Sequence, residues 1–72
     1  MAIGERIKSA RVRAGLSLRD LADKVGVSAQ AISKYERGLD APGSGVLIQL
    51  ARALQVRVEY LLRPLNISLS QP

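Results

Sequence analysis

Residues 18–37, LRDLADKVGVSAQAISKYER, hold the most informative pattern of this 72-residue chain. Two helices of about two turns each are expected here, joined by Gly26-Val27-Ser28, and that link is too short for an antiparallel pair. A turn of this length sets two helices at about 90–120° to each other. Such packing needs a small residue where the helices touch, a glycine in the turn and a branched apolar residue in the second helix. Ala22, Gly26 and Ile32 meet these three needs in that order.

Further short helices are predicted on both sides of this pair. Before it, apolar residues recur on one helical face until Gly15 ends the pattern, at Ile3, Ile7, Ala10 and Ala14. Ser17 is expected to cap the second helix, with Asp20 completing a capping box, and Ser28 to cap the third, which Gly38 ends.

Two more helices are predicted after a loop at residues 39–44. The fourth has apolar residues at a spacing of three to four, namely Val46, Leu47, Leu50, Ala51 and Leu54. The fifth is short, covers residues 58–62 and ends before Pro64. The expected fold is therefore all-α, a compact bundle of five short helices.

The last residues follow another pattern. Residues 65–70, LNISLS, alternate apolar and polar side chains, which is the period of a strand. Because a lone strand is not stable, this tail is expected to be disordered or to pair with something outside these residues. The predicted division is a domain at 3–63 and a tail or linker at 64–72 that can lead into a further domain.

Composition narrows the function. The chain has 11 Lys and Arg against 6 Asp and Glu, a formal net charge of +5. This surplus favours an anionic partner, with nucleic acid ahead of membrane, although a solvated surface explains the same charge. Histidine and cysteine are absent and the carboxylates are not clustered, so we expect no enzyme, no metal site and no cofactor. With two Tyr and no Phe or Trp, stacking on single strands is not expected.

No apolar run reaches the roughly 18 residues that a membrane span needs. The first residues also lack the basic-then-apolar order of a signal peptide. We therefore expect a cytoplasmic protein with no membrane contact.

The chain resembles the phage-repressor and Cro-type helix-turn-helix domains of the XRE family, which are lambda-repressor-like. The matching residues are Gly15-Leu16-Ser17, Leu21-Ala22, Gly26-Val27-Ser28, Ile32-Ser33, Tyr35-Glu36-Arg37-Gly38, Pro42, Leu47, Leu50-Ala51, Leu54, Val56 and Tyr60-Leu61-Leu62. The resemblance covers about residues 3–62. It implies a five-helix DNA-binding domain with its motif at 18–37 and its recognition helix at about 28–37. Such domains are usually dimeric on their operator, with the third helix in the major groove.

The resemblance also implies contact residues. Its base-contact positions fall on Ala29, Gln30, Ser33 and Lys34. Glutamine pairs with adenine, lysine donates to guanine, serine serves either base, and alanine offers a methyl to thymine. The phosphate contacts are expected from Arg11, Ser17, Leu18, Arg19, Arg37 and Gly38, some of them through backbone N–H groups. The alternative is a solvated polar helix face. Ordinary surface charge is the favoured interpretation for Lys8, Arg52, Arg57 and Arg63.

By the same resemblance, Arg11 and Glu36 form a partly buried ion pair between the first helix and the end of the third; two unrelated surface charges are the alternative. Ala22, Gly26, Ile32 and Glu36 are thus expected to hold the motif together. Other residues depart from the family pattern. Leu18 replaces a common Gln, Ala29 replaces a polar residue, Asp40 makes the loop less attractive to phosphate, and Arg57 stands where a capping Ser is common.

The predicted function is sequence-specific binding of double-stranded DNA by a dimeric transcriptional regulator, a repressor, on a near-palindromic operator. Self-association is expected at an apolar end formed by Tyr60, Leu61, Leu62 and Leu65, with closing of the core as the alternative for these residues. One alternative function is the DNA-binding part of a larger fused regulator, or an antitoxin. Another is a protein-interaction module that has lost DNA binding, which Leu18, Ala29 and Asp40 favour.

Overall fold

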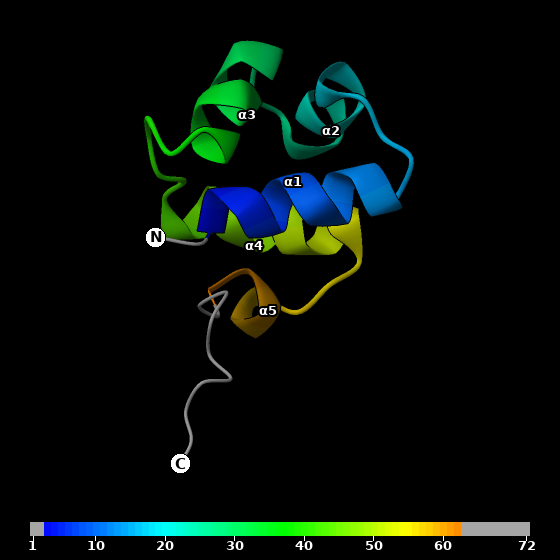
Figure 1. The fold of residues 1–72 in the computed structure, drawn as a ribbon, viewed down its shortest axis with the longest axis vertical. Helices are drawn as coiled ribbons and strands as arrows, with labels where there is room; N and C mark the ends of the chain where they lie inside the picture. The colour runs from blue at the N-terminus through cyan, green and yellow to red at the C-terminus, as the bar shows by residue number, and fades with distance from the viewer. Residues whose placement is uncertain (1–2, 63–72) are drawn as a thin grey trace.

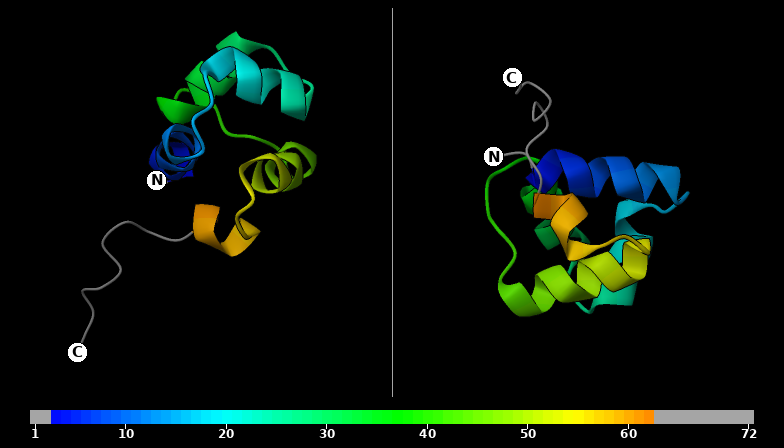
Figure 2. Two further views of the ribbon diagram at one scale, coloured as in Figure 1. Left: turned by 90° about the vertical axis from the view of Figure 1, so that its right-hand side faces the viewer. Right: turned by 90° about the horizontal axis from the view of Figure 1, so that it is seen from below.

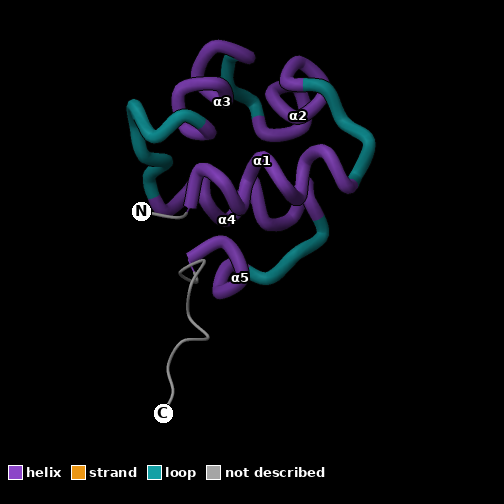
Figure 3. The backbone as a smooth tube through the Cα atoms, viewed as in Figure 1, coloured by secondary structure: helices purple, strands orange, loops and turns teal. Residues whose placement is uncertain are grey.

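The computed structural model describes residues 3–62 and folds them into five helices joined by loops (Figures 1 and 3). The helices are α1 (Ile3–Arg13), α2 (Leu18–Val25), α3 (Ala29–Glu36), α4 (Ser44–Leu54) and α5 (Val58–Leu62). No strand occurs within this range, which confirms the all-α prediction. Arg63 and the predicted tail at 64–72, which includes Leu65, lie outside the described residues.

The helices form three levels. Helices α1 and α4 lie side by side in the middle, α2 and α3 lie together on one side of them, and α5 lies on the opposite side (Figures 1 and 2). The helix pair that the sequence pattern singled out is therefore separated from α5 by the α1–α4 level.

Each helix contributes one completely buried side chain to a common core. These are Ile7, Leu21, Ile32, Leu50 and Leu61, each 0% exposed. Burial of such a side chain stabilises a fold by about 1.5–3 kcal/mol. Four of them lie on the predicted apolar faces of their helices. Leu61 closes the core, which was the alternative to its expected role in self-association. Ala14 is exposed, contrary to its predicted place on the buried face, because α1 ends at Arg13.

The first three helices end as predicted, at a glycine in the left-handed region. Gly15, Gly26 and Gly38 have φ values of 75°, 85° and 76°. Helix α4 ends in the same way at Gln55, with φ 59°, where the sequence carries no glycine signal. In each case a backbone N–H beyond the helix returns to its last turn, such as Leu39 N–H to the Lys34 carbonyl at 2.9 Å.

The predicted caps are also present. The Ser17 hydroxyl accepts a hydrogen bond from the Asp20 amide at 2.9 Å, and the Asp20 carboxylate accepts one from the Ser17 amide at 3.0 Å. Ser28 accepts from the Ala31 amide at 3.0 Å. Although Arg57 replaces a capping serine, α5 still forms, with the Tyr60 amide donating to the Arg57 carbonyl at 3.0 Å.

Candidate nucleic-acid interface

Helix α3 is buried on one side and open on the other. Ile32 and Tyr35 turn into the core, whereas Gln30 and Lys34 are exposed. Residues four apart lie on one helical face, so Gln30 and Lys34 form a single exposed polar strip. The Ser28 cap fixes where the helix begins, and Ile32 fixes which face it presents.

The four expected base-contacting residues are not equally accessible. Gln30 and Lys34 are exposed, but Ala29 and Ser33 are half-buried, and Ala29 packs against the edge of the core. The strip that α3 offers to a partner is therefore centred on Gln30 and Lys34.

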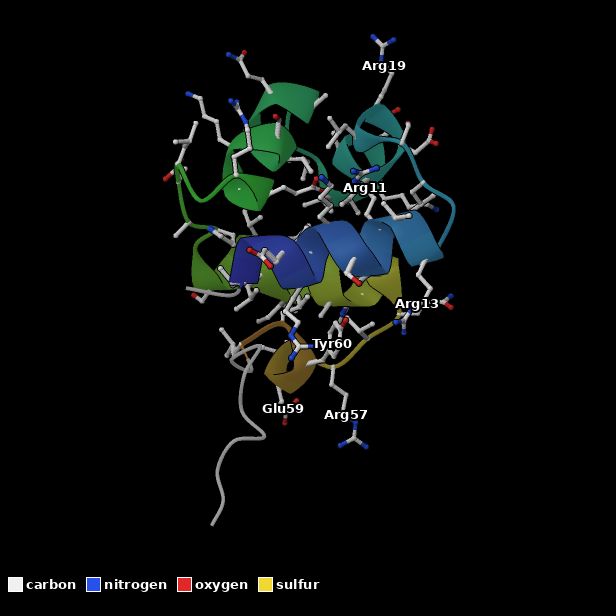
Figure 4. All side chains as sticks on the ribbon, viewed as in Figure 1. Arg11, Arg13, Arg19, Arg57, Glu59 and Tyr60 are labelled. Carbon is white, nitrogen blue, oxygen red and sulfur yellow. The ribbon has the colours of Figure 1, made fainter. Side chains whose placement is uncertain are left out.

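The start of α2 combines unpaired backbone N–H groups with a nearby carboxylate. The first turn of a helix leaves N–H groups without intrahelical partners, and here they belong to residues such as Leu18 and Arg19. The Asp20 carboxylate, however, occupies the Ser17 amide at the same helix start. That hydrogen bond, and next the Ser17 hydroxyl, lower the pKa of Asp20, so the carboxylate stays ionised. Leu18 packs partly on the core, and Arg19 projects from the outer level, away from Arg57 and Glu59 (Figure 4).

Arg11 and Glu36 form the predicted ion pair. Arg11 Nε lies 2.7 Å from Glu36 Oε2 and Nη2 lies 3.1 Å from Oε1, while the side chains are only 13% and 5% exposed. Nη1 also donates to the Leu16 carbonyl at 2.9 Å. The hydrogen bond to Glu36 raises the pKa of Arg11 further above its ordinary value. The guanidinium thus joins α1, the loop before α2 and the end of α3 (Figure 4).

The end of α3 adds a cation and a turn at a glycine. Arg37 is exposed, and its Nε donates to the Ser33 carbonyl at 3.4 Å. Gly38 then turns the chain into the loop, where the Asp40 carboxylate accepts a hydrogen bond from the Ala41 amide at 2.9 Å. Lys34, Arg37 and Asp40 are all exposed, so this part of the chain carries two positive charges and one negative charge.

The opposite end of the molecule has a different character. A cavity of about 820 Å³ opens where α1, α4 and α5 meet, between Arg13, Arg57, Glu59 and Tyr60 (Figure 4). The Arg6 guanidinium lies 4.9 Å from the centre of the Tyr60 ring, and its hydrogen bond lowers the pKa of Tyr60. Leu61 is buried, whereas Leu62 is 54% exposed. Among the described residues of the predicted apolar end, Leu62 is therefore the exposed one.

The described residues contain no candidate for a metal site or for a membrane-spanning helix. Among residues 3–62, no three His, Cys, Asp or Glu side chains gather as a group that could hold a metal ion. In the same range no helix is long and apolar enough to cross a membrane.

One buried residue gave no functional signal in the sequence. Gly4 lies in α1 against the end of α3, and a Cβ there would meet the main-chain carbonyl oxygens of Tyr35 and Glu36, the latter at 2.7 Å. Gly4 lies three residues before Ile7, but this spacing does not reveal its contact with α3.

Comparison with known proteins gives a consistent result. A family model described as helix-turn-helix matches residues 7–61. The HTH-type transcriptional regulator Rv0474 of Mycobacterium tuberculosis is 48% identical over 58 residues, which are 81% of this chain and 41% of that protein. This chain therefore spans less than half the length of that curated relative.

Solved structures match over most of their length. The P22 c2 repressor, solved in complex with a synthetic operator, has 39% identity and a TM-score of 0.80, covering 82% of this chain and 89% of that one. SinR from Bacillus subtilis, solved in complex with DNA, has 40% identity and a TM-score of 0.80, covering 85% and 98%. In both, the backbone is similar to that of this chain, and about two residues in five are identical.

Proposed function

Since this chain belongs to the helix-turn-helix family of DNA-binding transcriptional regulators, we propose that it reads a specific duplex through α3 and represses transcription as a homodimer. The family is one of DNA-binding regulators rather than of enzymes. The repressor role follows from the likeness to the P22 c2 repressor, whose structure holds an operator.

The exposed strip of α3 carries this proposal. In helix-turn-helix proteins the recognition helix lies in the major groove and its N-terminal residues reach base edges. Gln30 is in the first turn of α3 and exposed, and a glutamine amide pairs with adenine N6 and N7. Lys34 follows one turn later and donates to guanine O6 or N7. Ser33 and Ala29, being half-buried, are assigned secondary contacts with a base edge and a thymine methyl.

Phosphate contacts are assigned to groups around this strip. Arg37 and Arg19 are exposed cations, and the backbone N–H groups at Ser17, Leu18 and Gly38 lie at helix boundaries. Three N–H groups of Arg11 already donate hydrogen bonds within the chain, so a phosphate would be bound by its remaining N–H groups. If about four to six phosphates are neutralised per domain, the logarithm of affinity falls with the logarithm of salt at a slope of about −4 to −5.

A homodimer is proposed because a two-fold axis places two recognition helices about 34 Å apart, one turn of DNA. The end of the molecule at α5 is the candidate interface, since Leu62 is exposed there. The natural protein is proposed to extend beyond this domain, because the chain spans 41% of its M. tuberculosis relative and 49% of the regulator ImmR from Bacillus subtilis.

The experiment that tests the function is selection of bound duplexes from a random pool, followed by titration at two salt concentrations. The selected duplex is expected to bind about 10³-fold or more tightly than random duplex, the lower end for specific recognition. Equal affinity for both would leave only non-specific binding. Absence of binding at low salt would overturn the DNA assignment and favour a protein-interaction module.

A further inference from the structure

Gly4 marks the closest approach between α1 and α3. A Cβ built at this residue would lie 2.7 Å from the Glu36 carbonyl oxygen, 3.0 Å from the Glu36 carbonyl carbon and nearer still to the Tyr35 carbonyl oxygen. All three atoms belong to the main chain of the last turn of α3. A side chain can turn aside to admit a methyl group, but a helix backbone cannot. Only glycine therefore fits here without moving one helix.

The other glycines of the described chain do not share this property. A Cβ added at Gly15, Gly26, Gly38, Gly43 or Gly45 would meet nothing within 4 Å. Three of these residues serve helix ends with positive φ, whereas Gly4 lies in the first turn of α1 and has no positive φ. A turn conformation therefore does not explain glycine at residue 4, but the close contact with α3 does.

A second contact joins the same end of α3 to α1. Glu36, whose carbonyl faces Gly4, also binds Arg11 of α1 through its carboxylate. The two attachments lie about two turns apart along α1 and meet on one residue of α3. They fix both the distance between the helices and the direction in which α3 leaves the core.

From this geometry we propose that Gly4 is a positioning residue for base recognition: the close α1–α3 contact that it permits sets the depth at which Gln30 and Lys34 meet the bases. This inference rests on the proposed function. A methyl group at residue 4 must move by at least about 0.7 Å to reach an ordinary contact of 3.4 Å with the Glu36 oxygen, and by more to clear the nearer Tyr35 oxygen. A hydrogen bond from α3 to a base that is lengthened from 2.9 Å by this amount exceeds hydrogen-bond distance. The attraction between a cation and a phosphate changes little over the same shift.

The test compares Gly4→Ala with two controls whose expected effects on stability are opposite. Gly45→Ala lies in α4 with open space around it and is expected to stabilise the domain. Ala51→Gly lies on the buried face of α4, a helix that packs mainly against α1, α2 and α5, and is expected to destabilise the domain. For each variant, affinity is measured for the selected duplex and for random duplex under conditions where circular dichroism shows a folded protein. The ratio of the two affinities does not depend on the folded fraction.

Gly4→Ala is expected to reduce this ratio at least about tenfold, the effect of losing one bidentate base contact, while its affinity for random duplex stays close to that of the parent chain. Both controls are expected to keep the parental ratio. Amide chemical shifts without DNA supply a second measurement, in which Gly4→Ala shifts signals along the whole of α3. An unchanged ratio, or shifts confined to the first turn of α1, would overturn the proposal.

Two further outcomes are also decisive. If Gly4→Ala does not fold, the double variant with Gly45→Ala is used; a chain still unfolded shows that Gly4 serves folding alone and overturns the proposal. If the parent chain does not prefer any duplex, the proposed function itself fails. The amide shifts then still report whether Gly4 positions α3, so the two failures are distinguishable.

Discussion

Gln30 on α3 and Arg37, the residue that follows this helix, are both exposed, but their chemistry predicts different effects on binding. Gln30→Ala should cost about 1–3 kcal/mol of affinity for the selected duplex and relax the preference at one base pair. Arg37→Ala should weaken binding to all duplexes alike and reduce the salt slope by about one, because one phosphate contact is lost. Affinities for a set of single-base variants at several salt concentrations measure both effects. A changed base preference in Arg37→Ala, or uniform weakening in Gln30→Ala, would exchange the two roles.

The Arg11–Glu36 pair predicts a difference between single and double substitutions. Because both side chains are largely buried, removing one leaves the other charge without its partner, and Glu36→Leu or Arg11→Met alone should destabilise the fold by about 3 kcal/mol or more. In Arg11→Met with Glu36→Leu, neither charge remains, so the loss should be smaller than in either single variant. Urea unfolding of the four proteins measures this. Additive losses would show that the pair acts as two independent surface charges.

Among the helices, α2 has a pH-sensitive start. The Ser17 amide, and next the Ser17 hydroxyl, lower the folded-state pKa of Asp20. A carboxylate with a lowered pKa adds stability above its unfolded pKa of about 4, and this stability is lost as the pH falls through the folded pKa. Asp20→Asn should therefore flatten the decline of the unfolding free energy in this acid range. A Ser17→Ala variant should restore the pKa only in part, since the amide remains, as NMR titration of the Asp20 carboxyl would show.

The end of α4 predicts a stabilising substitution. Gln55 is the one residue other than glycine with positive φ in the described chain, and the left-handed conformation costs a side-chain-bearing residue about 1–2 kcal/mol. Gln55→Gly should remove this strain and raise the free energy of unfolding by up to about 1 kcal/mol, after the greater entropy of an unfolded glycine is subtracted. Thermal unfolding measures the gain. Gln55→Ala is the control, since it keeps the strain and should bring no such gain.

The elements also show what a sequence can and cannot predict. Local signals marked the ends of α1, α2 and α3, because serine caps and terminal glycines act within a few residues. The end of α4 carried no such signal, since Gln55 adopts a glycine conformation there.

Spatial relations were predicted less well. The Arg11–Glu36 pair joins residues 25 apart and was expected only through family resemblance. Partial burial of Ala29 and Ser33 was not predicted, because a helical repeat does not define the edge of a buried face. The contact at Gly4 depends on how two distant helices meet, which no spacing reveals.

For the whole molecule, the separation of α3 from α5 predicts that dimer formation and base reading are independent. Leu62 is 54% exposed on α5, on the side of the α1–α4 level away from α3 (Figure 2). If it lies in the dimer interface, Leu62→Ser should weaken binding to a two-half-site duplex about tenfold or more, because a linked pair of sites gains from effective concentration. Affinity for a single half-site should remain unchanged, since α3 is not altered. Ile48→Ser, at a residue 47% exposed on α4, is the matched control and should leave both affinities as they were. Equal losses on both duplexes would place Leu62 in the stability of the monomer rather than in its association.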